Sequence, residues 1–170
     1  RYTFTENDLG SGFTVSNVIN GNSLTDPTLQ LCNAKFPSES HRETRNQIVA
    51  LPKSASSTYA KKYSFISSEA VEYESKLWAS KTLTEIDTAV KKCNPRTTSV
   101  KKLNYLSPAN VKARSLLFIT KSKNINQFLY ATFQVKNNIM VGTYVISNSL
   151  LNSSEVSKWS QVSPKMGIRL

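Results

Sequence analysis

The chain has 170 residues, 39% of them hydrophobic and 19% charged, and its 22 Lys and Arg residues against 11 Asp and Glu residues give a formal net charge of +11. This length predicts one domain spanning residues 1–170. The apolar content argues against wholesale disorder, and because no run of 18 apolar residues occurs, the sequence predicts no transmembrane helix. Five Gly and six Pro residues exclude a collagen-like composition.

The first third of the chain alternates short regular elements with turns. Thr5 is a favourable N-cap and Gly10 a favourable stop for one helical turn. Alternating apolar residues indicate strands, and Asn-Gly and Asp-Pro pairs indicate a loop between them. The predicted elements are a helical turn over 5–10, strands over 13–18 and 45–51, a loop over 20–27, a turn over 38–41 and a Ser-rich loop over 53–58.

The strongest helical pattern lies near the middle of the chain. Five residues recur at the spacing of one buried helix face: Ala79, Leu83, Ile86, Val90 and Cys93. Thr82 and Glu85 match a capping box, and the Asn94-Pro95 pair ends the helix. The pattern predicts one long helix that carries Cys93 on its buried face at the last turn.

The second half of the chain is mostly strand. The run 116–119 is apolar on both faces, which predicts a strand in the centre of its sheet. The short Asn-rich link 136–138 predicts a hairpin between its two flanking strands. The predicted strands cover at least 70–74, then 99–105, 113–120, 127–135 and 139–146, and a C-terminal helix capped by Ser153 or Ser154 is limited by Pro164.

This order of elements predicts an α+β fold. The connections between residues 113 and 146 are too short for the helical crossovers that parallel strands require. We therefore expect an antiparallel sheet of about five to seven strands, with one long central helix and a C-terminal helix packed on it.

The chain has two cysteines, Cys32 and Cys93, and one histidine, His41. Four converging metal ligands are missing, so a structural zinc site is not expected. Two buried thiols or one disulfide remain, and the even count in a chain rich in Ser and Asn favours the disulfide. The disulfide would close a loop of about 60 residues, and the lower entropy of the unfolded chain would then stabilise the fold by roughly 4 kcal/mol at most. A disulfide would also indicate an oxidising compartment.

Candidate catalytic groups are few. His41 could serve as a general base, but an exposed position in a connecting turn is the favoured interpretation. Glu72 and Glu74 would share one face of an extended segment, as in a glycoside hydrolase, although such acids more often form a solvated edge. A hydrolase with an unrecognised carboxylate site is therefore kept as an alternative hypothesis.

Basic residues occur in groups and alternate with aromatic residues, which suggests a second alternative, a basic module that binds single-stranded nucleic acid. The absence of an RNP-type pattern makes nucleic acid the less favoured partner. The residues concerned are Lys61, Lys62, Lys91, Lys92, Arg96, Lys101, Lys102, Arg114, Lys121 and Lys123, with Tyr105, Phe118, Tyr130 and Tyr144.

Three stretches together resemble a known family. They are the run 9–15 (LGSGFTV), the run 31–39 (LCNAKFPSE) with Arg42 and Arg45, and Glu72-Tyr73-Glu74 followed by a helix that ends in Cys93. They resemble a family of actinobacterial secreted lipoproteins that is similar to the extracellular sensor domain of mycobacterial membrane Ser/Thr kinases. The resemblance covers roughly the first 95 residues. It implies an exported domain with an antiparallel sheet, a cleft suited to ligand capture and a Cys32–Cys93 pair.

These observations predict a non-enzymatic, extracytoplasmic sensor-like domain of the bacterial cell envelope, at the cell surface or secreted, whose signal or lipid anchor lies outside this sequence. Its expected partner is a small-molecule, lipid or cell-wall ligand, with an anionic surface as a further possibility. The candidate ligand-binding residues are Arg42, Arg45, Glu72 and Tyr73. We predict no cofactor, no metal ion and no catalytic residue.

Overall fold

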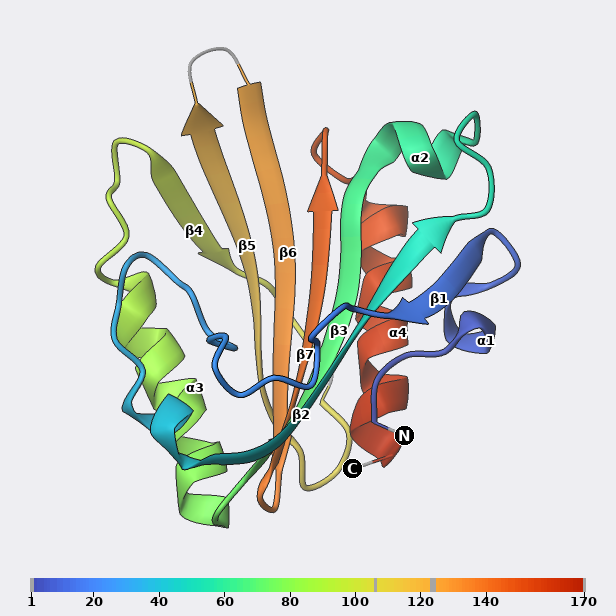
Figure 1. Cartoon of the computed structure of the whole chain (residues 1–170). Helices are drawn as coiled ribbons and strands as arrows, with labels where there is room; N and C mark the ends of the chain where they lie inside the picture. Colours follow the sequence, from blue (N-terminus) through green and yellow to red (C-terminus); the bar gives the residue numbers. More distant parts are fainter. Residues whose placement is uncertain (1, 106, 123–124, 170) are drawn as a thin grey trace.

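The computed structural model describes residues 2–105, 107–122 and 125–169, and it shows one antiparallel sheet of seven strands with helices on both faces (Figure 1). The strand order across the sheet is β1-β2-β3-β7-β6-β5-β4. The strands are β1 (Phe13–Asn17), β2 (Arg42–Pro52), β3 (Tyr63–Tyr73), β4 (Thr98–Lys102), β5 (Lys112–Ser122), β6 (Ile125–Lys136) and β7 (Ile139–Ser147). The helices are α1 (Glu6–Leu9), a 3₁₀ turn η1 (Pro37–His41), α2 (Thr58–Lys62), α3 (Lys76–Val90) and α4 (Ser153–Arg169).

The predicted α+β class with an antiparallel sheet is confirmed, but the described residues form no single long central helix. Helix α3 has 15 residues, and α4 is slightly longer with 17. The two helices cover opposite faces of the sheet, and each buries its own apolar stripe there (Figure 1). Ile86 of α3 packs in one layer with Phe133, whereas Trp159 of α4 packs in the other with Tyr63.

The late strands form the expected meander. The link between β6 and β7 is a hairpin whose turn residue Asn137 has a φ of 54°, a conformation that asparagine tolerates well. Strand β5 is buried on both faces, as predicted, but it lies beside the edge strand β4 rather than in the centre. Leu116 packs in the α3 layer and Leu117 in the α4 layer, because a helix covers each face.

The start of α3 differs from the prediction. The helix begins about two turns earlier than the expected capping box at Thr82 would place it, and Ser75 is its N-cap, accepting from the backbone of Trp78. Glu85 lies inside the helix and accepts hydrogen bonds from the backbone and hydroxyl of Ser38 (3.3 and 2.6 Å). Glu85 therefore caps η1 rather than its own helix. Cys93 lies just beyond the end of α3 instead of on its last turn.

Three further features, one of α2 and two of α4, differ from the prediction. Ser57 caps the short helix α2, where a Ser-rich loop alone was expected. Asn152, not Ser153 or Ser154, caps α4 through reciprocal hydrogen bonds with Glu155 (2.9 and 3.0 Å). Helix α4 also continues through Pro164 to Arg169. Proline removes one helical hydrogen bond, but the buried residues on both sides of it keep the helix on the sheet.

The disulfide between Cys32 and Cys93 is confirmed, with 4.8 Å between the two Cα atoms. It joins the irregular segment between β1 and η1 to the end of α3. Among the described residues, no helix has both the length and the apolar character needed to cross a membrane.

We expect the variant Cys32→Ser/Cys93→Ser to lose about 2–4 kcal/mol of unfolding free energy, because the unfolded chain is no longer constrained by a loop of about 60 residues. Urea denaturation under oxidising conditions measures this loss. Reduced wild-type protein is the control and should match the variant. Equal stability of the variant and the oxidised wild type would contradict the prediction.

Helix α3 is also attached to the sheet by an ion pair. The guanidinium of Arg114 in β5 donates to both carboxylate oxygens of Asp87 at 2.8–3.0 Å. The hydrogen bonds from Arg114 hold the pKa of Asp87 below its usual value of 3.8. Since the folded pKa is the lower one, the stabilisation by Asp87 is complete above about pH 4 and is lost as the pH falls through the folded pKa.

Asp87→Asn should therefore be less stable than wild type at pH 7, and the difference should shrink as the pH falls below about 4. Urea midpoints measured across this pH range give the comparison. Glu43→Gln, which removes an exposed carboxylate with no ion pair among the described residues, should show no such pH-dependent difference. A difference for Asp87→Asn that is independent of pH would refute this account.

Candidate ligand-binding site

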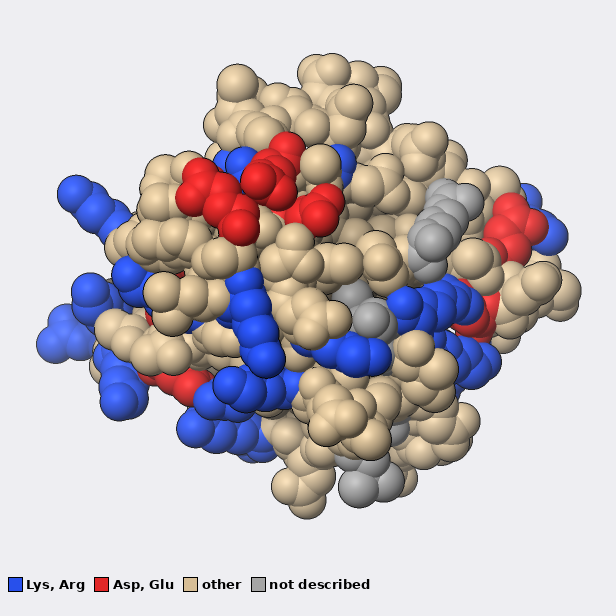
Figure 2. Space-filling model, turned by 90° about the horizontal axis from the view of Figure 1, so that it is seen from below, with Lys and Arg blue, Asp and Glu red and all other residues tan. Residues whose placement is uncertain are grey.

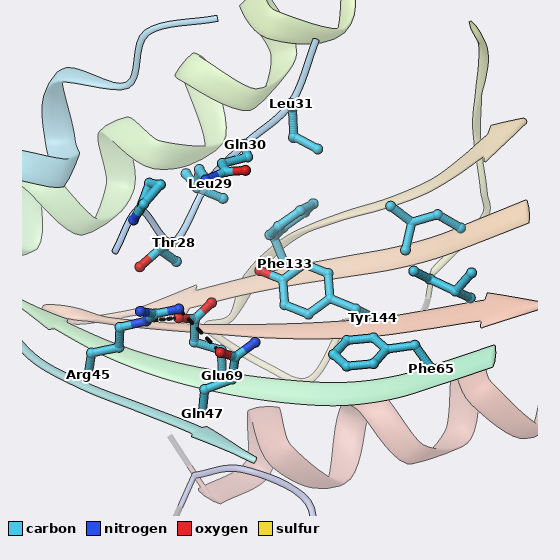
Figure 3. Close-up of a pocket in the computed structure, with 13 residues that line it drawn as sticks. Thr28, Leu29, Gln30, Leu31, Arg45, Gln47, Phe65, Glu69, Phe133 and Tyr144 are labelled. Atoms are coloured by element: carbon cyan, nitrogen blue, oxygen red, sulfur yellow. Dashed lines mark hydrogen bonds and ion pairs between the residues drawn. The ribbon is translucent and has the colours of Figure 1, made fainter. Parts of the chain in front are cut away.

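A cavity of about 410 Å³ lies between the sheet and the irregular segment 27–31, on the face that carries α3 (Figure 3). Strands β2, β3, β7 and β6 supply its floor, and the segment 27–31 forms its roof. The lining residues are Pro27, Thr28, Leu29, Gln30, Leu31, Arg45, Gln47, Phe65, Glu69, Leu129, Phe133, Tyr144 and Ile146.

Strand register brings the floor residues together from distant parts of the sequence. Gln47 lies opposite Glu69, Glu69 lies opposite Gly142, and Gly142 lies opposite Phe133. A Cβ atom at position 142 would overlap the phenol of Tyr144, so the ring can occupy this position because residue 142 is a glycine. The Tyr144 ring lies over Gly142, where no side chain is present, and its hydroxyl is directed towards Glu69 (Figure 3). The ring meets the Phe133 ring edge-on, with 5.7 Å between the two ring centroids.

One end of the cavity contains a buried ion pair between Arg45 and Glu69, which are only 8% and 1% exposed. The remaining donors of Arg45 bind the Ser23 carbonyl (3.1 Å) and the Gln47 side chain (3.3 Å). Burial raises the pKa of the Glu69 carboxyl, although the Arg45 guanidinium opposes the shift. The two charges compensate each other, so the pair adds no net charge to this end of the cavity.

The Tyr144 hydroxyl is the unusual group in this cavity. It is buried and has no hydrogen-bond partner in the described part of the chain. Burial also raises the pKa of Tyr144 well above its usual value of 10, so the phenol stays protonated and able to donate. A buried polar group without a partner costs about 1–3 kcal/mol, and a bound molecule that accepts its proton would remove this cost.

The roof of the cavity is fastened by Glu39 and Arg42. The Glu39 carboxylate accepts from the backbone N–H groups of Thr28 (2.7 Å) and Leu29 (3.2 Å). Arg42 donates to the Thr28 hydroxyl (2.8 Å) and to the Leu24 carbonyl (2.7 Å), and it pairs with Glu39 at 3.4 Å. Burial raises the pKa of Glu39 in this position. These contacts hold an irregular segment at a defined distance above the sheet.

Of the four residues predicted to bind a ligand, the structure brings Arg45 alone to this cavity. Arg42 uses its donors on the roof segment. Glu72 lies on the other face of β3 and accepts from the Asn138 amide (3.1 Å). Tyr73 is fully buried in the α3 layer. Ligand binding by any of these residues stays a prediction.

Glu69 and Tyr144 line the cavity but were not among the residues predicted to bind a ligand. An acid between the small and apolar residues of β3 is one signal, because such a residue is rarely buried without a partner. A glycine two residues before a tyrosine in β7 is another, because it leaves room for the ring on the same strand face. Neither signal identifies Arg45 as the partner, since that contact depends on strand register.

The other candidate groups lie apart from the cavity. His41, at the end of η1, stacks on Trp78 at 3.4 Å and lies 2.7 Å from a Glu74 oxygen. In the described ranges, no three His, Cys, Asp or Glu residues are grouped to hold a metal ion.

The aromatic residues of the nucleic-acid hypothesis do not share one exposed face. Phe118 packs in the α3 layer and Tyr130 in the α4 layer, while the Tyr105 hydroxyl donates to Gln134 (2.7 Å). Tyr144 lines the cavity. Lys123 lies outside the described residues.

Solved structures share this fold. The extracellular domain of PknH from Mycobacterium tuberculosis is similar with a TM-score of 0.52 and 7% identity, over 96% of this chain and 89% of that one. An uncharacterised protein from Mycobacterium smegmatis, the Rv0999 ortholog, is similar with a TM-score of 0.51 and 14% identity, over 97% and 93% of the two chains. No family model matches the sequence, and no curated protein matches it. The predicted structural resemblance to mycobacterial extracellular kinase domains is therefore confirmed at the level of the fold.

We expect Glu69→Leu to lose about 3–5 kcal/mol, because it leaves the Arg45 guanidinium buried without its counter-charge. The double variant Arg45→Met/Glu69→Leu should cost less than the sum of the two single variants, since no uncompensated charge remains. Urea denaturation of the four proteins in this double-mutant cycle provides the test. Additive costs would show that the two charges are not coupled.

Proposed function

We propose that this chain is a non-enzymatic, extracytoplasmic binding domain of the bacterial cell envelope that holds a small amphipathic ligand in the cavity under segment 27–31. The disulfide supports an oxidising compartment. The fold, which is similar to that of a mycobacterial extracellular domain, supports the same location. The proposal covers a domain that is either secreted or tethered at the cell surface.

The chemistry of the cavity favours a ligand with an uncharged polar head and an apolar body. Glu69 already compensates the charge of Arg45, so a charged head would leave one charge unpaired in a buried site. A hydroxyl-bearing head can accept from Tyr144 and donate to the Glu69 carboxylate. Phe65, Leu129 and Ile146 then contact the apolar body.

The size of the cavity supports this class of ligand. Its volume of about 410 Å³ lies in the range of small-molecule sites, which are mostly apolar with a few placed polar groups. The single observation that carries the proposal is the buried Tyr144 hydroxyl without a partner, beside a charge-compensated ion pair.

A series of probes with one alkyl chain and different heads tests the proposal. Hexyl glucoside, hexanoate and hexylamine share the apolar body and differ in charge. We expect hexyl glucoside to shift the backbone NMR signals of segment 27–31 and of β7 at lower concentration than either charged probe. Preference for a charged probe, or no shift at these residues with any of the three, would overturn the proposal.

Tyr144→Phe separates binding from folding. Removing an unpartnered buried hydroxyl should leave stability unchanged or raise it slightly, while affinity for hexyl glucoside should fall on the order of tenfold. Tyr73→Phe is the matched control, because the Tyr73 hydroxyl is also buried without a described partner but does not line the cavity. Thermal denaturation and NMR titration give the two readouts. Equal affinity of both variants would contradict the role of Tyr144.

A further inference from the structure

A second hollow, of about 560 Å³, lies at the end of the molecule where α3 begins and where the β6–β7 turn and the loop before β5 also lie (Figure 1). Three lysines from these three elements line it, Lys76, Lys112 and Lys136. Figure 2 shows this end of the molecule, where basic side chains form a band across the face; one group of acidic side chains lies above the band, and others lie beside it at the two sides.

The charges of these lysines are not compensated within the described part of the chain. The six ion pairs found there use His41, Arg42, Arg45, Lys62, Arg114 and Arg169. None of the described Asp and Glu residues lines the hollow. Three ammonium groups around one opening repel one another unless an anion is present between them.

The start of α3 adds a second, independent argument. The N-terminus of a helix carries a partial positive charge, so acidic residues are favoured in its first turn and lysines are not. Helix α4 follows this rule with Glu155. The first turn of α3 has no acidic residue and begins with Lys76, although its length gives it a comparable dipole. The ammonium of Lys76 and the partial positive charge of the α3 N-terminus therefore repel each other, and an anion in the hollow would attract both.

The other lining groups suit an oxyanion. Ser80, Asn110 and Asn137 line the same hollow. A serine hydroxyl and an asparagine side-chain amide can each donate a hydrogen bond to an anionic oxygen. The N-cap hydroxyl of Ser75 accepts from Trp78, which leaves the backbone N–H groups of Lys76 and Leu77 without a described partner at the same helix end.

We propose that this three-lysine hollow binds a phosphate group. The three ammonium groups provide the charge, and Ser80, Asn110 and Asn137 orient the oxygens. The site is separate from the cavity under segment 27–31, with which it shares no lining residue. The phosphate can belong to a soluble ligand or to a lipid headgroup, and two arms of one experiment distinguish these sources.

In the first arm, pyrophosphate is titrated into the protein and followed by NMR. In the second arm, the protein is sedimented with vesicles of phosphatidylcholine that contain phosphatidic acid, against vesicles of phosphatidylcholine alone. Three proteins are compared: wild type, Lys76→Gln/Lys112→Gln/Lys136→Gln, and the control Lys53→Gln/Lys92→Gln/Lys101→Gln. The control variant has the same net charge but changes lysines that do not line the hollow.

Wild type and control should bind pyrophosphate with shifts at the amides of Lys76 and Leu77, and the hollow variant should bind on the order of tenfold or more weakly. Binding to phosphatidic acid vesicles but not to pyrophosphate assigns the phosphate to a lipid headgroup, and binding in solution assigns it to a soluble ligand. Either result supports the site if the hollow variant alone is impaired. Equal loss in both variants, or no binding in either arm, would overturn the proposal. Unchanged thermal denaturation shows that the variants are folded, as the exposed positions of Lys76 and Lys112 lead us to expect.

Discussion

The covalent link between Cys32 and Cys93 is the constraint on which the candidate site depends. The chain between β1 and η1 has no regular secondary structure, yet it forms the roof of the cavity. Such a segment has no backbone ladder to hold it in place, and its conformational freedom opposes an ordered position. The disulfide fixes one end to α3, and the contacts of Glu39 and Arg42 fix the part above the sheet. The cavity exists because these attachments keep the roof in place.

Charged side chains are compensated in one of the two proposed sites and not in the other. Inside the cavity, Arg45 and Glu69 form a compensated pair that is almost completely buried. At the end of the molecule where α3 begins, three lysines surround a hollow without a described counter-charge. A buried charge must be compensated by the protein itself, whereas an exposed charge is solvated by water and can be compensated by a ligand or by ions from solution. This difference explains why the two proposed sites favour different ligand chemistry, an uncharged polar head in one and a phosphate in the other.

The sequence-based predictions were reliable where the signal is local. The apolar stripe of α3, the hairpin at Asn137 and the capped turn at Thr5 all depend on neighbours a few residues apart, and the structure contains each of them. The errors occurred where tertiary contacts override a local preference. Glu85 matched a capping box but caps η1, because Ser38 lies against it in the fold. Pro164 was expected to limit α4, but burial against the sheet keeps the helix intact.

The sequence by itself determined the class of fold and favoured its covalent link, because strand periodicity, short late connections and an isolated cysteine pair are properties that can be recognised along the chain. The tertiary structure alone decided where the cavity lies and which residues line it. Pairing of β3 with β7 places Glu69 beside Gly142 and leaves space for the Tyr144 ring, although these residues are far apart in sequence. The periodicity of a strand defines which of its residues share a face, but not which other strand lies next to it. Strand order and register therefore had to be known before the polar end of the cavity could be recognised.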